Sequence, residues 1–322
     1  AVCAGLERDG KLGSRQLAGS IPGSRVIGTV VVEPGAEFDD RRRLTSETIP
    51  PRLLETDIGP GTARRPQNAV GGSGYARGAI EAGIDCGYLT RERRGGQEYV
   101  RATTRYPDRW FDGLVGIENK PDLDRPGELE LQLRKDVSLS LFDEVWLATA
   151  SHVTGAHLNR IPEGVGVWRV DPETGDRTTV REATPLDPKR GGIEILETHP
   201  GHTEIRTVTD EEKRKYRRRV AERAYGKGWR VAFPDCPHVE ERAVAGVDAL
   251  AYCTRQEQLV RPADACESED EGPEVDVDAS RAAHSPWGSD QAGARHKQVG
   301  LARCIQYCPP CTASGSATAW SA

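Results

Sequence analysis

The pattern that most constrains the fold is a strand, a helix and a second strand that follow one another along the chain. Residues 113–120, GLVGIENK, and residues 143–151, DEVWLATAS, are apolar runs that predict buried strands. Between them, residues 125–142 predict an amphipathic helix. Its apolar side chains recur at a spacing of four, at Leu129, Leu133, Val137 and Leu141. This order implies two parallel strands joined by a right-handed crossover, so we expect an α/β domain.

Further elements are predicted on either side of this unit. Residues 1–10 predict the end of a helix, and residues 24–35 predict a strand closed by a Pro-Gly turn. Residues 165–183 predict a hairpin. Residues 209–229 predict a helix with Thr209 as its cap and acids in its first turn.

An insertion separates the first strand from the central unit. Residues 36–70 are polar with little periodicity, whereas residues 75–103 predict a short helix and then a hairpin that turns at Arg94-Gly95-Gly96. A helix followed by a basic hairpin is the outline of a winged helix. Nucleic acid would then meet the arginines of this hairpin, Arg91, Arg93 and Arg94.

We therefore expect four parts. They are an α/β core at 1–35 and 104–233, the insertion at 36–103, a cysteine-containing segment at 234–266 and a disordered tail at 267–322. The net charge of −6 gives no general attraction to nucleic acid or to an anionic membrane, so such binding would need a local basic patch. No apolar stretch approaches the roughly 20 residues that span a bilayer, and the first residues lack the pattern of a signal peptide. We expect a cytoplasmic protein.

The charged end of the first central strand has a possible chemical use. Glu118 and Lys120 leave the same face of an extended strand. A carboxylate can hold Mg²⁺ or Mn²⁺, and a lysine beside it can orient a water or stabilise charge that develops on a phosphate. The alternative is a surface ion pair at a strand end, worth well under about 1 kcal/mol.

This stretch resembles the PD-(D/E)xK nuclease superfamily, particularly its RecB-like branch, in which the (D/E)xK strand is followed by a helix with an inward glutamine and by another strand. Glu118 and Lys120 match the carboxylate and the lysine, and Gln132 matches the glutamine. The resemblance implies a restriction-endonuclease-like mixed sheet flanked by helices, and Mg²⁺-dependent hydrolysis of DNA phosphodiester bonds. The whole chain also resembles an uncharacterised haloarchaeal protein family, which adds no established activity.

The chain departs from this superfamily at the second metal ligand, an aspartate upstream of the (D/E)xK strand. Gly28 occupies the place expected for it and cannot bind a metal, so Glu33, Asp57 or Asp112 would have to substitute. Two main hypotheses follow. The chain is either a metal-dependent nuclease or a protein that keeps the fold, has lost the metal and binds DNA. A structural α/β domain with a coincidental charged strand end is the third.

The cysteines leave several possibilities open. Zn²⁺ accepts sulfur and imidazole ligands, which Cys236, His238, Cys253 and Cys266 could supply. Some RecB-like nucleases hold a 4Fe–4S cluster with one cysteine in the first helix and three near the C-terminus. That resemblance assigns Cys3 together with Cys236, Cys253 and Cys266, although their spacing is wider here. Otherwise the thiols pack as small apolar groups.

The helix predicted at 209–229 is strongly basic. Residues such as Arg217 and Arg218 could follow a phosphate backbone. The alternative is a solvated helix whose long charged side chains lie around Tyr216 and Val220.

Overall fold

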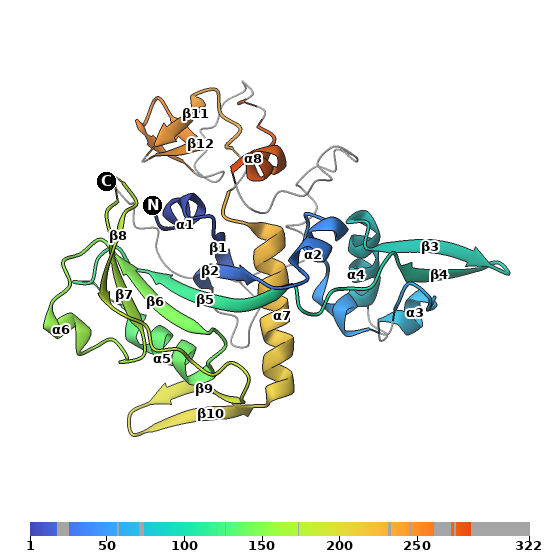
Figure 1. Cartoon of the computed structure of the whole chain (residues 1–322), viewed down its shortest axis with the longest axis horizontal. Coiled ribbons are helices and arrows are strands. Elements are labelled where there is room, and N and C mark those ends of the chain that lie inside the picture. The colour runs from blue at the N-terminus through green and yellow to red at the C-terminus, as the bar shows by residue number, and fades with distance from the viewer. Residues whose placement is uncertain are drawn as a thin grey trace.

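A six-stranded mixed sheet lies at the centre of the computed structural model, in the order β1-β2-β5-β6-β7-β8 (Figure 1). Its strands are β1 (Leu12–Leu17), β2 (Ile27–Pro34), β5 (Phe111–Asn119), β6 (Glu144–Thr149), β7 (Gly166–Val170) and β8 (Arg177–Arg181). The structure describes residues 1–17, 26–56, 58–70, 74–125, 127–172, 174–230, 233–244, 246–260, 272–273 and 275–284. β1, β2 and β5 are antiparallel, whereas β5, β6 and β7 are parallel. The α/β class and the parallel pair β5–β6 are as predicted.

Helices cover both faces of this sheet. On one face, Ile117 and Trp146 pack with Val2 and Leu6 of α1 (Val2–Arg8). The other face is covered by α5 (Leu129–Leu139) and α7 (Asp210–Lys227). Its core includes Leu114 and Leu147 of the sheet together with Leu129, Leu133 and Val220 of these helices. Because both faces are buried, the central strands are continuous apolar runs.

The capping of α7 follows the prediction from its sequence. Thr209 Oγ1 accepts a hydrogen bond from the Glu212 amide, and the Glu212 carboxylate accepts one from the Thr209 amide. This reciprocal capping box satisfies two amide groups that the first turn of a helix leaves without partners. From there α7 runs past η1 (Pro51–Glu55), an element of the insertion, where Arg219 pairs with Glu55, and it ends beside β1, where Lys227 Nζ donates to Gln16 O.

The insertion projects from the sheet as a separate lobe (Figure 1). Besides η1 it contains α2 (Phe38–Leu44), α3 (Pro66–Ala69), α4 (Gly74–Asp85), β3 (Leu89–Arg94) and β4 (Gln97–Ala102). An isolated bridge joins Arg64, just before α3, to Val100 of β4. The β3–β4 turn lies at Gly95 and Gly96, with φ of +56° and +78°, as the sequence predicted. Positive φ at both positions suits glycine and a tight hairpin.

Smaller elements surround these two parts. They are α6 (Gly155–Leu158), the hairpin of β9 (Gly192–His199) and β10 (His202–Val208), a sheet of β11 (Val239–Val244), β12 (Val247–Cys253) and β13 (Gln258–Leu259), and α8 (Val277–His284). The prediction of a disordered tail from residue 267 is wrong for the residues of α8, and residues 285–322 lie outside the described part of the chain. None of the helices in the described ranges has the length and apolar character needed to cross a membrane.

Candidate functional site

The end of β5 carries the predicted acidic residue, Glu118, and the register places Gly28 beside it. Thr29 of β2 pairs with Ile117 of β5. A Cβ added to Gly28 would lie 3.3 Å from Glu118 Oε2 and 2.9 Å from the Ile117 carbonyl oxygen. Gly28 therefore faces Glu118, as expected for the missing aspartate. The two strands also approach so closely here that any side chain at Gly28 would contact backbone.

The acids proposed as substitutes lie at the other end of the same strands. Glu33 pairs with Gly113, five residues along β2 from Gly28, or roughly 17 Å at about 3.3 Å per residue. Asp112 lies at this end as well, with its Oδ1 2.8 Å from a Cβ added to Gly35. Glu33 and Asp112 therefore cannot share a cation with Glu118, because ligand oxygens of one Mg²⁺ each lie about 2.1 Å from it. Asp57 is outside the described residues.

Lys120 and Gln132 lie near the same end of the sheet as Glu118. The Lys120 amide donates to Ala148 O at 2.9 Å, which extends the β5–β6 pairing one position beyond the strand. Glu118 pairs with Leu147 of β6. Leu147 lies in a hydrophobic cluster that also contains residues of α5, the helix that carries Gln132. The structure thus places Glu118 and Lys120 at one edge of the sheet and Gln132 in the first turn of α5, and the residue that faces Glu118 from β2, Gly28, carries no carboxylate.

Hydrogen bonds join the loops that follow β5 and β6. Pro121 O accepts from Thr149 Oγ1 at 3.2 Å, and from the amide and hydroxyl of Ser151 at 3.2 and 3.1 Å. A small cavity of about 70 Å³ remains nearby, lined in part by Leu129, Leu133 and His157. Pockets for small molecules are usually about 300–1,000 Å³, so this cavity suits no substrate of that kind.

Two basic residues of α7 that were predicted to contact nucleic acid, Arg217 and Arg218, have partners within the protein. Arg217 is 8% exposed and donates to Leu141 O at 2.6 Å and to Asp143 Oδ2 at 2.8 Å. The prediction that Arg217 contacts nucleic acid is therefore wrong, because its guanidinium is buried against the core. Arg218 is partly exposed and donates to Asp108 Oδ1 at 3.3 Å, which joins α7 to the segment between β4 and β5.

The arginines of the β3–β4 hairpin lie on the surface, where their partners are exposed or half-buried acids. Arg91 pairs with Glu81 and Glu98, the latter at 3.2 Å. Arg94 pairs with Glu92 at 2.6 Å, and Arg93 is exposed. Exposed pairs of this kind contribute little to stability, so these side chains can exchange partners at small cost.

The cysteines pack as small apolar groups in the described part of the chain. Cys236 and Cys253 are buried in the core of the β11–β12–β13 sheet. His238 is exposed, and Cys266 lies outside the described residues. Cys3 lies beneath β2 with its Sγ 3.6 Å from Thr29 Oγ1, and burial raises the pKa of its thiol. Within the described ranges, these residues do not form a group of three possible metal ligands.

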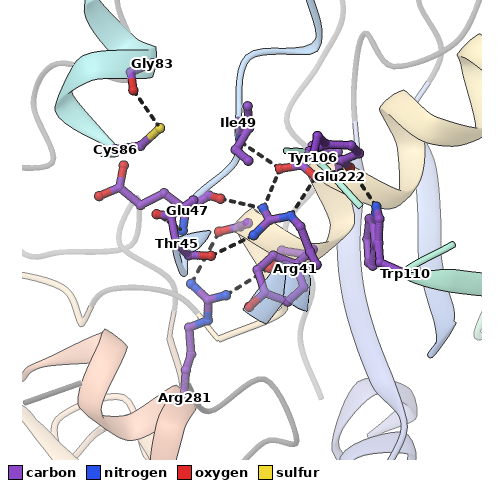
Figure 2. Close-up of polar contacts among 12 residues, drawn as sticks. Arg41, Thr45, Glu47, Ile49, Gly83, Cys86, Tyr106, Trp110, Glu222 and Arg281 are labelled. Carbon is purple, nitrogen blue, oxygen red and sulfur yellow. Dashed lines mark hydrogen bonds and ion pairs between the residues drawn. The ribbon is translucent and has the colours of Figure 1, made fainter. Parts of the chain in front are cut away.

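A buried polar network, which the sequence did not reveal, joins α2 of the insertion to α7 (Figure 2). Arg41 and Glu222 are both 0% exposed, and Arg41 Nε donates to Glu222 Oε2 at 2.9 Å. The same carboxylate accepts from Tyr106 Oη at 2.8 Å and from the Ile49 amide at 2.7 Å. Trp110 Nε1 donates to Tyr106 Oη at 2.6 Å. Burial and the nearby Glu222 carboxylate raise the pKa of Tyr106 well above its usual value.

This network is structural in character. Arg41 also donates to the carbonyl oxygens of Thr45 and Glu47, at 2.7 and 2.9 Å, and its guanidinium lies 4.1 Å from the ring centroid of Tyr225. Its donors are thus directed at the protein itself, and they fix the insertion against α7. A fully buried ion pair with this many partners can hold two parts of a chain in one relative position.

A second group of polar residues missed by the sequence reasoning lies at the tip of the β9–β10 hairpin. Ligand atoms of His199, His202 and Glu204 all lie within 4.8 Å of one another. The signal in the sequence was the palindrome ETHPGHTE at residues 197–204, centred on a Pro-Gly turn.

Comparison with known proteins adds a family but no activity. One family model matches residues 12–274, and its description is "Family of unknown function (DUF5787)". No curated protein and no solved structure is significantly similar to the chain.

Proposed function

Since the chain belongs to the family of unknown function DUF5787, whose description names no activity, we propose from its geometry that it is a DNA-binding protein built on a nuclease-like sheet that does not hydrolyse DNA. The observation that carries the proposal is the contact between Gly28 and β5. A hydrolytic site of the type that the sequence resembles needs a second carboxylate at this position. Among the residues that the structure describes, Gly28, Glu33 and Asp112 do not fit such a metal site with Glu118.

The close approach of the strands supports this loss. A Cβ at Gly28 would lie 2.9 Å from a backbone oxygen of Ile117, closer than side chains normally lie. Backbone cannot move aside as readily as the end of a flexible side chain. The sheet is therefore adapted to glycine, and an aspartate would require the strands to separate.

The order of elements in the insertion supports DNA binding. A winged helix consists of a helix, a short strand, two helices and a two-stranded wing, with the short strand paired to the second strand of the wing. Here α2 and the short η1 are followed by the bridge residue Arg64, then by α3, α4 and the β3–β4 hairpin, and Arg64 pairs with Val100 of β4. In such folds the second of the two helices between the short strand and the wing enters the major groove. In this chain that helix is α4.

The charge of this segment also supports DNA binding. Residues 64–103 contain seven arginines and four acids, in a chain whose net charge is −6. Arg91, Arg93 and Arg94 are all exposed on the hairpin. Contacts between such side chains and phosphates release counterions and so dominate non-specific DNA binding.

The test is fluorescence anisotropy with a short labelled DNA duplex over a range of salt concentrations, with chelator present. We expect binding in chelator, and an affinity that falls linearly with salt on logarithmic axes. Arg93→Ala/Arg94→Ala should weaken binding and reduce the slope by about 0.9 for each phosphate that is no longer neutralised. The matched control is Arg134→Ala, an exposed arginine of α5 that pairs with Glu130 at 2.6 Å and lies outside the insertion. No salt-dependent binding, or an equal decrease in affinity in both variants, would contradict the proposal.

The second candidate is a Mg²⁺-dependent nuclease, and one observation favours it. The elements α1, β1, β2, β5, α5 and β6 follow one another in the order of that nuclease core, with Glu118 and Lys120 at the end of β5. The same protein should therefore be incubated with single- and double-stranded DNA in Mg²⁺ or Mn²⁺. Cleavage that disappears in Glu118→Ala and Lys120→Ala would replace the binding-only proposal with this one.

A further inference from the structure

We propose that the tip of the β9–β10 hairpin is a binding site for a divalent transition-metal ion such as Zn²⁺. Its ligands are His199, His202 and Glu204, with Glu197 available as a fourth. The ligand atoms of the first three lie within 4.8 Å of one another, and no other group of this kind occurs among the residues described. The site is separate from the basic hairpin and from the sheet edge that carries Glu118, so it does not depend on the proposed DNA binding.

The palindrome ETHPGHTE explains how the ligands converge. In the antiparallel hairpin it pairs like with like, as Glu197 with Glu204, Thr198 with Thr203 and His199 with His202. Paired residues share one face of a hairpin, and successive residues alternate between faces. Two imidazoles and two carboxylates therefore lie on one face of the tip, and the two threonines lie on the other.

A tight turn and a β-bulge set this arrangement. Pro200 fixes its own φ, and Gly201 adopts φ +99°, so the two-residue turn holds the imidazoles of His199 and His202 with 4.6 Å between ring centroids. Further along, Glu204 pairs with Glu197 but Ile205 pairs with Ile195, so the strand β9 contains one extra residue. This bulge brings a glutamate, rather than Leu196, opposite Glu204.

The electrostatics of the tip favour a cation. Like charges placed directly opposite on neighbouring strands are destabilising, and Glu197 faces Glu204. His199 Nε2 lies 3.7 Å from a carboxylate oxygen of each, so imidazole nitrogen and both carboxylates already point toward one region. A bound cation would remove the repulsion between the carboxylates.

The ligand set indicates which cation would bind. Two imidazole nitrogens with one or two carboxylate oxygens suit Zn²⁺ and its transition-metal neighbours, whereas Mg²⁺ and Ca²⁺ prefer oxygen ligands alone. In the tetrahedral geometry of Zn²⁺, ligand atoms about 2.1 Å from the ion lie about 3.4 Å apart. The ligand atoms, which now lie within 4.8 Å of one another, therefore need to approach by up to about 1.4 Å, which side chains at a hairpin tip can do by rotation.

The first test is isothermal titration of the full chain with Zn²⁺ at about pH 8, where ordinary imidazoles are neutral. His199→Ala/His202→Ala should lose one equivalent of bound ion, or bind it at least tenfold more weakly. The matched control His152→Ala removes an exposed imidazole from another loop and should bind as the unmodified chain does. A further control, Cys236→Ser/Cys253→Ser, should keep this equivalent, because the site contains no thiolate. Unchanged binding by the histidine double variant would refute the site.

A second test separates a metal site from a merely structural cluster. Without metal, Glu204→Gln should melt at the same or a higher temperature than the unmodified chain, because the substitution removes the repulsion with Glu197. With Zn²⁺ the unmodified chain should gain thermal stability, and Glu204→Gln should gain less. A cluster that stabilises the hairpin by itself would give the opposite result, in which Glu204→Gln lowers the melting temperature and Zn²⁺ affects both proteins equally.

Discussion

Replacement of Arg41 by methionine should strongly destabilise the protein. Methionine keeps much of the length of the side chain but removes the guanidinium from a site in which Arg41 and Glu222 are both 0% exposed. The Glu222 carboxylate would then keep its bonds from the Ile49 amide and Tyr106 Oη, but it would lose both donors of its charged partner. A charge would remain buried without an opposite charge to compensate it.

The expected magnitude follows from the removal of that partner. Removal of one partner from a buried ion pair costs about 3–5 kcal/mol in the free energy of unfolding. The carbonyl oxygens of Thr45 and Glu47, which lose the other bonds from Arg41, are part-buried and add little if water reaches them. In a domain of this size about 1 kcal/mol changes the melting temperature by roughly 2–4 °C, so the decrease should be roughly 6–20 °C.

Urea unfolding followed by circular dichroism measures this free energy. The matched control is Arg219→Met, which changes an arginine of α7, the helix that also carries Glu222. Arg219 pairs with Glu55 at 2.6 Å, and the two side chains are 37% and 32% exposed. An exposed pair is worth at most about 1 kcal/mol, so this control should unfold almost as the unmodified chain does. The double variant Arg41→Met/Glu222→Gln should be less destabilised than the sum of the single variants, because neither charge is then left alone.

Two results would refute this reasoning. One is an Arg41→Met variant within about 1 kcal/mol of the unmodified chain, which would mean that water or another cation reaches Glu222. The other is an additive double variant, which would mean that the two side chains do not interact across the junction between the insertion and α7.

Two further predictions follow from individual contacts. Gly28→Ala should lower the free energy of unfolding by about 1–3 kcal/mol, because the added Cβ would lie 2.9 Å from Ile117 O. In the control Gly13→Ala, in β1, the added Cβ meets no atom within 4 Å, so this variant should lose little stability. Equal urea unfolding of the two variants would contradict the close contact at Gly28. The hydrogen bond from the Thr209 amide and the Arg206 guanidinium lower the pKa of Glu212 in the folded protein. The ionised Glu212 carboxylate therefore stabilises the fold fully above the ordinary glutamate pKa of about 4.3, and this stabilisation is lost as the pH falls through the lower pKa of the folded state. Glu212→Gln should therefore flatten the decrease in melting temperature between about pH 5 and pH 3, and parallel curves for the two proteins would show that the cap does not titrate.

The sequence predicted the central strands, whose burial is complete, but it missed β1, whose environment is set by residues far away in the chain. β5 and β6 were predicted because both of their faces are covered, which leaves continuous apolar runs in the sequence. β1, with the sequence LGSRQL, is also largely buried, but its Ser14 hydroxyl donates to Gly228 O at 2.9 Å, a residue 214 positions away. No local pattern in the sequence indicates that partner.

The candidate site was predicted only in part, for a related reason. The place of Gly28 opposite Glu118 was implied by the resemblance to the nuclease superfamily, but the distance of Glu33 from that point depends on the register between β2 and β5. For Arg217, by contrast, the sequence held an unused signal. Arg217 is one helical turn from Val220 and Ala221, on the buried face of α7, and that position indicates a structural partner rather than a phosphate.

The rigid attachment of the insertion has a consequence for the proposed function. The wing joins the sheet at the start of β5, near Phe111, whereas Glu118 lies near the end of the same nine-residue strand. Seven residue steps at about 3.3 Å separate Phe111 from Glu118 by roughly 23 Å, and the Arg41–Glu222 network holds the insertion against α7. A duplex bound at the wing would therefore lie well away from the Glu118 carboxylate. If DNA binds there, Arg93→Ala should change the affinity for DNA and Glu118→Ala should leave it unchanged, whereas a duplex that is processed at the sheet edge would respond to both substitutions.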